Sequence, residues 1–266
     1  MNTVLLAIII VASGLLVGLM AGLIGIGGGS LIIPLFNLGF GLPILNATAT
    51  SLFTVFCTSC SGTIGHIRNK TTNLKIALAL AIPGLCLSPL GAILAGRTPA
   101  PTLTCITAAI LIIPIVQNIM SVYKQKKAKA LDPAREVSWS QEHLDARTLA
   151  VCIPAGAFAG FCSGLVGLGG GFVIIPIMSG LLKRGMHEVT ATSVTFIFIT
   201  SIAGTITHAL AGDIAWLYGI LVAVGSIPGA LIGSRLSKKI DGLYLKYILA
   251  VVLVFVCIAL FIRGLG

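Results

Sequence analysis

The chain has 266 residues, of which 57% are hydrophobic and only 9% are charged, and its mean hydropathy is +1.09. A soluble domain carries roughly a quarter charged residues, so this composition excludes a single soluble core. The formal net charge of +10 does not indicate nucleic-acid binding, because the basic residues lie between apolar runs, where membrane topology explains them.

Apolar runs of membrane-spanning length recur from one end of the chain to the other. Each approaches the ~20 residues that a membrane helix needs. The runs cover 3–24, 47–66, 74–95, 102–122, 148–168, 189–208, 214–234 and 244–262. The first run does not resemble a signal peptide, because the first basic residue of the chain is Arg68. The runs do not alternate polar and apolar residues as barrel strands do, so we predict an all-α polytopic membrane protein.

The chain also repeats itself with an offset of 142 residues. GLIGIGGGSLIIP at 22–34 returns as GLVGLGGGFVIIP at 164–176, and TATS at 48–51 returns at 190–193. An internal repeat of this length indicates a duplicated structural unit.

The repeat divides the chain into three parts. We predict a first transmembrane repeat over 1–122, a hydrophilic linker over 123–147 and a second transmembrane repeat over 148–266. Each repeat holds about four long helices plus a short apolar piece after its glycines, at 30–40 and 172–182.

The basic residues predict how the repeats face the membrane. If each half crosses an odd number of times, 15 of the 17 Lys and Arg lie inside; an even number places 10 of the 17 there. The positive-inside rule favours the odd count, which makes the two repeats inverted in topology. Each half then crosses five times, or three times if the short piece forms a re-entrant hairpin. We expect a multi-pass protein of the cell (inner) membrane with a cytoplasmic linker and both termini outside.

The glycine motifs are the candidate binding site. A helix that starts after consecutive glycines directs free N–H groups and its positive end at the break, which attracts anions. Irregular backbone at membrane depth must be buried or line a cavity, and inverted-repeat transporters bind solute near the midplane. The candidates are Gly25, Gly27, Gly28, Gly29 and Ser30 in the first half, and Gly167, Gly169, Gly170, Gly171 and Phe172 in the second.

We expect Ser30 to contact solute and Phe172, at the equivalent position, to shape the cavity. A structural kink at Pro34 or Pro176 is the alternative to a binding site. The glycines spaced by four residues before each break are expected to serve close helix packing: Gly14, Gly18, Gly22, Gly156, Gly160 and Gly164.

Hydroxyl groups follow each break in the repeated TATS segments. Thr50, Ser51, Thr192 and Ser193 either bond to neighbouring backbone or donate to an oxyanion.

Two histidines and one cysteine complete the candidates. His66 and His208 close equivalent helices, as headgroup-level residues or as groups that gate or handle protons. Cys162 lies close to the second break and is a weak candidate for solute contact, with packing as the alternative.

The positions of the acidic residues in the sequence favour an anion as the solute. All seven lie in loops or at the edges of apolar runs, whereas a cation carrier needs a carboxylate in mid-span.

We expect a small anionic solute and the lipid bilayer as partners, without nucleic acid, cofactor or metal. The sequence has neither G-x-S-x-G nor H-E-x-x-H, so we do not expect an enzyme.

The paired GLIGIGGGSLIIP and GLVGLGGGFVIIP, their following ATATS and VTATS, and the two G-T-x-x-H helix ends resemble the TauE/SafE sulfite exporter family. The resemblance covers both repeats. It implies a secondary transporter (permease) of small sulfur-containing anions such as sulfite or organosulfonates. A passive anion channel or uncoupled facilitator is the alternative.

Overall fold

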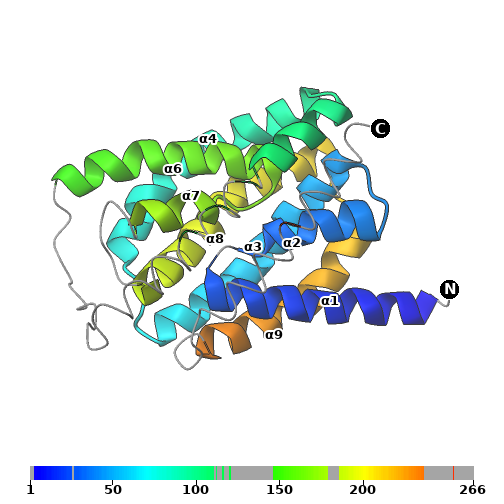
Figure 1. Ribbon diagram of the computed structural model, residues 1–266, viewed down its shortest axis with the longest axis horizontal. Coiled ribbons are helices and arrows are strands. Elements are labelled where there is room, and N and C mark those ends of the chain that lie inside the picture. Colours follow the sequence, from blue (N-terminus) through cyan, green and yellow to red (C-terminus); the bar gives the residue numbers. More distant parts are fainter. Residues whose placement is uncertain are drawn as a thin grey trace.

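The computed structural model describes residues 3–25, 27–110, 146–178 and 186–236, with isolated positions at 112, 116, 120 and 254. These residues form helices and connecting turns, and no strand occurs among them (Figure 1). The first half contributes α1 (Thr3–Ile24), α2 (Gly29–Pro34), the π-helix η1 (Leu35–Gly39), α3 (Ile44–Arg68) and α4 (Leu74–Arg97). The second half contributes α6 (Ala146–Val166), α7 (Gly171–Pro176), α8 (Met186–Ala211) and α9 (Trp216–Leu236).

Six of these helices are long and apolar enough to cross a membrane, namely α1, α3, α4, α6, α8 and α9. A shorter apolar helix, Ala100–Ile110, begins the predicted run 102–122. The predicted run 244–262 lies outside the described residues except for position 254, and the predicted linker lies outside them up to Ala146, where α6 begins. The prediction of an all-α polytopic membrane protein is confirmed.

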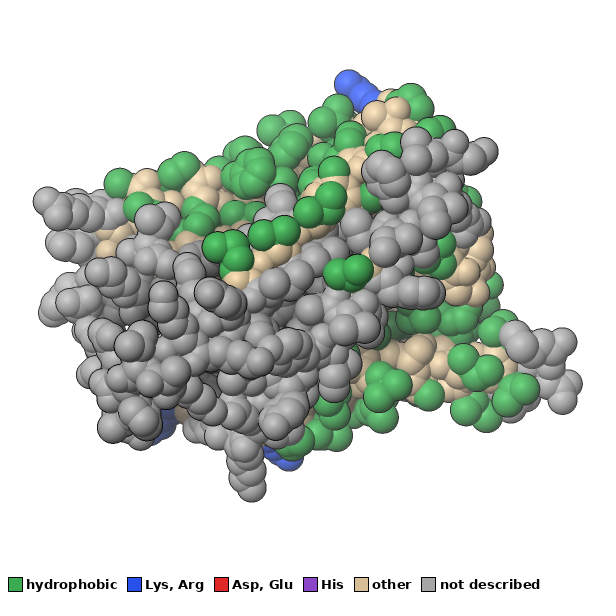
Figure 2. All heavy atoms as spheres, in the orientation of Figure 1, with side chains coloured by type: hydrophobic (Ala, Val, Ile, Leu, Met, Phe, Trp, Pro, Cys, Tyr) green, Lys and Arg blue, Asp and Glu red, His purple; other side chains and the backbone are tan. Residues whose placement is uncertain are grey.

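Large hydrophobic side chains are exposed on the described helices, and they predominate on the described part of the face in Figure 2. Leu16 on α1 is 66% exposed, Ile82 on α4 is 61% exposed and Leu217 on α9 is 70% exposed. Side chains of this kind would be unfavourable in water over so large a surface, whereas a lipid environment accommodates them.

The first long helix of each half packs against the last described long helix of the other half. In Figure 1, α1 lies beside α9 along one side, α4 lies beside α6 along the opposite side, and α3 and α8 fill the space between them. The predicted packing glycines make these contacts, because a Cβ on any of them would strike the backbone of the facing helix. The facing pairs are Gly14 with Val222, Gly18 with Ser226, Gly22 with Ala230, Gly156 with Leu80, Gly160 with Gly84, and Gly164 with Ser88.

The order of these pairs gives the directions of the helices. Along the contacts, the residue numbers increase in the same direction in α1 and α9, and likewise in α6 and α4, so the two helices of each pair are parallel. The central pair is antiparallel. In the pair of α3 and α8, the rings of Phe56 and Phe198 have centroids 5.6 Å apart, and further along α3 Gly62 lies beside Val194. The residue numbers increase in α3 while they decrease in α8.

Helix α3 also runs parallel to α9. Thr58 Oγ1 donates to Ser226 Oγ at 2.7 Å, and further along both helices Asn69 Nδ2, just after α3, donates to Ser234 O at 3.2 Å. Since α1 and α3 are both parallel to α9, they run in the same direction. The segment between them, which includes α2 and η1, must therefore carry the chain back.

Asn73 caps the start of α4 and joins the halves. Its side-chain oxygen accepts from Ile76 N at 3.3 Å, and its Nδ2 donates to Glu188 Oε1 at 3.0 Å.

We expect Asn73→Ala to lower the free energy of unfolding by about 1–2 kcal/mol, because a helix cap and a hydrogen bond to a carboxylate are lost together. A thermal-shift measurement on purified protein tests this. Lys75→Ala, at an exposed position in the same turn, is the control, and an equal melting temperature for the two variants would contradict the capping role.

Candidate functional site

Both glycine motifs form sharp breaks that only glycine accommodates without strain. The backbone φ angle is positive at three glycines of each break, in the region that L-residues with a Cβ rarely adopt. The glycines are Gly25 (82°), Gly27 (84°), Gly28 (76°), Gly167 (74°), Gly169 (82°) and Gly170 (72°). Helix α2 begins directly after Gly28 and α7 directly after Gly170, and no side chain caps either start.

The structure brings the two breaks into contact, although 142 positions separate them in the sequence. A Cβ on Gly29 would lie 2.7 Å from Gly167 O, and a Cβ on Gly171 would lie 3.1 Å from Gly25 O. The predicted glycine candidates of both halves therefore lie together in the interior, and their contact with a solute stays a prediction.

The serines of the TATS segments hold this contact together. Ser51 Oγ donates to Gly167 O at 3.0 Å, and Ser193 Oγ donates to Gly25 O at 3.0 Å. Each half thus binds the backbone of the other half's break through a buried hydroxyl. In this conformation both hydroxyl protons are used by the protein, so the role of these serines as donors to a solute stays a prediction.

The neighbouring threonines bind the turns that lead into the next helices. Thr50 Oγ1 accepts from Ala215 N at 2.9 Å, just before α9. Thr192 Oγ1 accepts from Asn73 N at 3.2 Å, just before α4. Each of these turns belongs to the other half, so the two threonines also join the halves, and solute contact by either stays a prediction.

Val55 and Ile197 fill the space between the two breaks. They occupy equivalent positions in α3 and α8, and both are fully buried. A Cβ on Gly27 would lie 2.9 Å from Ile197 Cδ1 and 3.6 Å from Val55 Cγ1, and one on Gly169 would lie 2.8 Å and 2.9 Å from the same two side chains. We call this pair the central plug. Sequence reasoning missed it, because an aliphatic residue in an apolar helix gives no signal by itself.

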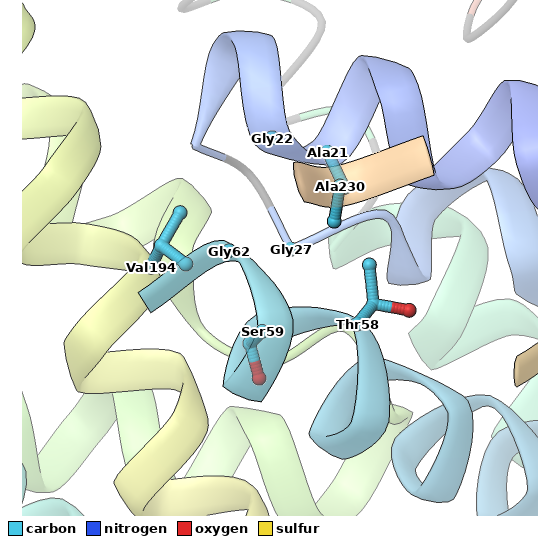
Figure 3. A pocket seen from close by; sticks show the side chains of 8 residues that line it. All are labelled: Ala21, Gly22, Gly27, Thr58, Ser59, Gly62, Val194 and Ala230. Carbon is cyan, nitrogen blue, oxygen red and sulfur yellow. The ribbon is translucent and has the colours of Figure 1, made fainter. Parts of the chain in front are cut away.

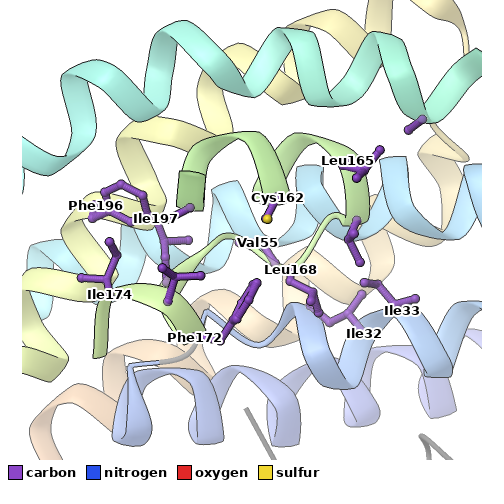
Figure 4. Packing of buried hydrophobic residues seen from close by; sticks show 14 of the residues in the cluster. Ile32, Ile33, Val55, Cys162, Leu165, Leu168, Phe172, Ile174, Phe196 and Ile197 are labelled. Atoms are coloured by element: carbon purple, nitrogen blue, oxygen red, sulfur yellow. The ribbon is translucent and has the colours of Figure 1, made fainter. Parts of the chain in front are cut away.

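Ser30 and Phe172, where the two motifs differ, are both buried, at 2% and 1% exposure. Phe172 belongs to the hydrophobic cluster around the central plug, which Figure 4 shows together with Cys162. Cys162 is 4% exposed and packs in the same cluster. The contact of Ser30 or Cys162 with solute stays a prediction.

A narrow pocket adjoins the first break between α1, α3, α8 and α9 (Figure 3). Its free space does not admit a water molecule, so the break is closed in this conformation. Thr58 and Ser59 supply the hydroxyl groups of its wall, and sequence reasoning did not select either. The lining residues are Ala21, Gly22, Gly27, Thr58, Ser59, Gly62, Val194 and Ala230.

The two histidines are buried rather than exposed at headgroup level, with 1% exposure each. His66 Nε2 lies 3.3 Å from Gly22 O, and His208 Nε2 lies 3.2 Å from Gly164 O. Both imidazoles therefore contact the backbone of the helix that leads into a glycine break. The described part of the chain holds no group of three His, Cys, Asp or Glu residues that could bind a metal ion.

These features define a multi-pass helical membrane protein organised around two interlocked glycine breaks. The model of the Sulfite exporter TauE/SafE family matches residues 10–260, so the chain belongs to this family.

The chain is also similar over nearly its whole length to proteins named as probable membrane transporters. It is 27% identical to "Probable membrane transporter protein YunE" of Bacillus subtilis, over 97% of this chain and 98% of that protein. It is 29% identical to "Probable membrane transporter protein MJ0441" of Methanocaldococcus jannaschii, over 94% and 93% of the two chains. No solved structure matches the chain.

Proposed function

We propose that this protein is a secondary transporter of small sulfur-containing anions such as sulfite or organosulfonates, and that the anion binds between the two glycine breaks near the membrane midplane. The family and the names of the relatives support the transporter class, and the family's description supports the sulfur-anion class. The observation that carries the site is the reciprocal pair of hydrogen bonds from Ser51 to Gly167 and from Ser193 to Gly25.

Helix ends and hydroxyl groups give the site its preference for an anion. Two uncapped helix starts, after Gly28 and after Gly170, direct backbone N–H groups toward the breaks. The carboxylates of the described residues are held elsewhere: Glu188 bonds Asn73 at one end of α8, and Asp213 bonds His208 beyond the other. An anion in the site would therefore meet donors without a facing carboxylate.

The directions of the helices support inverted repeats. α3 and its repeat counterpart α8 are antiparallel. Helices α1 and α3 run in the direction of α9, whereas α4 returns after the short turn that follows α3, and α6 is parallel to α4. The repeat counterparts α1 and α6, and likewise α4 and α9, therefore run in opposite directions. A transporter with this plan can present one central site to either side of the membrane by similar movements of its two halves.

Charged residues at the helix ends support the orientation. Arg68, Lys70 and Lys75 surround the turn between α3 and α4, and Arg235 ends α9 beside the same turn, whereas Arg97 lies at the far end of α4. The positive-inside rule places the first group in the cytoplasm. The linker 123–147 is then cytoplasmic and both termini are outside.

The conformation seen here would be a closed state of the transport cycle. The central plug contacts both breaks, and the narrow pocket beside the first break does not admit a water molecule. Opening of the site requires each break to move away from the serine that binds it, which would break the bonds from Ser51 to Gly167 O and from Ser193 to Gly25 O. The freed hydroxyls would then be able to donate to a bound oxyanion.

Counterflow in proteoliposomes tests the function. Purified protein is reconstituted and assayed with sulfite, thiosulfate, sulfate, sulfoacetate and taurine. We expect uptake of at least one sulfur-containing anion that is accelerated by the same anion on the opposite side, because a carrier returns faster when loaded. Flux without this acceleration would instead indicate a passive channel, and no flux of any anion would overturn the proposal.

A further inference from the structure

We propose that Ser88 and Ser163 form a subsite that binds oxygen atoms of the transported anion, beside the second glycine break. The subsite lies where α4, α6 and α8 meet. It rests on the proposed function, and it assigns the binding of the solute's oxygen atoms to the second half of the site.

The hydroxyl groups of these two serines are buried and unpartnered. Both residues have 0% exposure, and neither Oγ has a hydrogen-bond partner in the part of the chain that the structure describes. Serine and threonine in membrane helices usually bond back to a carbonyl of the preceding turn, as Thr54 Oγ1 does to Thr50 O at 2.8 Å. A buried hydroxyl without a partner lowers stability, so packing alone does not account for two of them at one place.

The glycines around the two serines place them together. A Cβ on Gly164, the residue after Ser163, would strike the backbone of Ser88. A Cβ on Gly204 of α8 would lie 2.6 Å from Ser88 Oγ and 3.7 Å from the Cα of Gly164, so the Ser88 hydroxyl is directed at the crossing of the three helices. Ser163 O accepts from Gly167 N at 2.8 Å. Ser163 therefore lies in the last turn of α6, directly before the break.

The first half has alanine at both equivalent positions. The repeat offset of 142 residues relates Ser163 to Ala21 and Ser88 to Ala230, and the contacts of the packing glycines follow the same offset. Ala21 and Ala230 belong to the wall of the narrow pocket beside the first break, where Figure 3 shows both. The repeat thus assigns the two serines to the corresponding wall beside the second break.

Leu52 covers this place in the closed conformation. A Cβ on Gly204 would lie 2.6 Å from Leu52 Cδ2 as well as from Ser88 Oγ, so the leucine side chain lies beside the hydroxyl. Leu52 directly follows Ser51, whose hydroxyl donates to Gly167 O at 3.0 Å. A movement that separates Ser51 from the second break would therefore also move Leu52 away from the serines.

Unpartnered hydroxyl groups suit the oxygen atoms of a sulfur oxyanion. Each hydroxyl carries one hydrogen that it can donate, and a hydrogen bond to an ionised acceptor is stronger than one between neutral groups. Ser51 and Ser193 must first release a backbone carbonyl before they can donate to a solute. Ser88 and Ser163 have no such bond to give up, so an anion gains their hydrogen bonds without a loss to the protein.

Isothermal titration of the purified protein tests the subsite, with sulfite, thiosulfate, sulfate, sulfoacetate and taurine as the probes. Ser88→Ala and Ser163→Ala copy the residues of the first half. We expect each variant to bind the tightest of the five anions about 10-fold more weakly, because a hydrogen bond to a charged group is lost. Unchanged affinity in either variant would overturn the proposal. Ser226→Ala is the control and should keep its affinity, since it removes a buried hydroxyl that lies 2.7 Å from Thr58 Oγ1.

Melting temperatures measured without any anion test whether the two hydroxyls lack a partner. Loss of an unpartnered buried hydroxyl should leave the melting temperature of Ser88→Ala and Ser163→Ala unchanged or raise it, whereas Ser226→Ala loses a bonded hydroxyl and should melt at a lower temperature. A decrease in the two variants as large as in Ser226→Ala would show that their hydroxyls hold a structural partner, such as a buried water molecule. That result would also overturn the proposal.

Infrared difference spectra of the bound anion separate direct contact from an effect on opening. The S–O stretching bands report the hydrogen bonds to the oxygen atoms of the anion, so we expect them to shift in each serine variant. Weaker binding with unchanged bands would show that the serines act only through the conformation of the protein, and the subsite would be wrong.

The two possible failures are distinguishable. If the unmodified protein exchanges an anion in counterflow and either serine variant binds that anion equally well, only the subsite fails. If the unmodified protein neither binds nor moves any of the five anions, the proposed function fails and the subsite fails with it.

Discussion

We expect Gly160→Leu to force α6 away from α4 and to lower the melting temperature of the purified protein sharply. A Cβ at Gly160 would strike the backbone of Gly84, and backbone atoms cannot turn aside as the end of a side chain can. Overpacking against side chains typically costs about 1–3 kcal/mol, and a clash with backbone along a whole helix interface should exceed this. Thermal shift and size-exclusion chromatography in detergent measure the effect.

Gly96→Leu is the matched control, because it makes the same change on an exposed position of α4. A Cβ on Gly96 would meet nothing within 4 Å. Leucine also has a higher helix propensity than glycine, so this variant should be as stable as the unmodified protein or more so. Equal melting temperatures for Gly160→Leu and Gly96→Leu would contradict close packing of α6 on α4.

The helices and their packing glycines could be predicted from the sequence because their signals are local. A run of about 20 apolar residues is sufficient to identify a membrane helix, and glycines four residues apart lie on one face of it. The sequence could not identify the partner of each glycine face. Gly160 meets Gly84 of the other half, and this depends on how the whole chain folds rather than on the residues near either position.

Sequence reasoning selected the glycine breaks and the TATS hydroxyls that bind them, but it missed the two aliphatic side chains between the breaks. Positive φ angles at Gly28 and Gly170 follow from the glycine motifs themselves. Val55 and Ile197 were missed because an aliphatic residue in a membrane helix is expected everywhere. Their position between the breaks comes from the antiparallel crossing of α3 and α8, which only the assembled structure shows.

The acid beside His208 shows a further limit of sequence reasoning. An offset of 142 residues aligns Asp213 with Thr71, but the aligned letters do not show that both side chains meet a histidine five positions earlier. The turn after each helix folds back so that Asp213 N donates to His208 O and Thr71 N donates to His66 O. This local backbone geometry brings Thr71 to His66 and Asp213 to His208.

We expect Gly28→Leu and Gly170→Leu each to abolish flux of whichever anion the protein carries, while the protein still inserts into the membrane. A residue with a Cβ at these positive φ angles costs about 1–2 kcal/mol, which a packed protein of this size can tolerate. The added side chains have no free space. A Cβ on Gly28 would lie 3.1 Å from Val17 Cγ1, and one on Gly170 would lie 2.5 Å from Ala159 O. Each break would therefore have to shift, and the start of α2 or α7 would shift with it.

The control for both variants is Gly41→Leu, which separates backbone strain from damage to the site. Gly41 also has a positive φ angle, 70°, but a Cβ there would meet nothing within 4 Å, and the residue lies outside both breaks. Gly41→Leu should therefore lose a similar amount of stability and keep its flux. Flux measured at equal amounts of reconstituted protein compares the three variants. Normal flux in both Gly28→Leu and Gly170→Leu would refute the central site, whereas loss of flux in Gly41→Leu as well would show that strain anywhere in the chain is sufficient to stop transport.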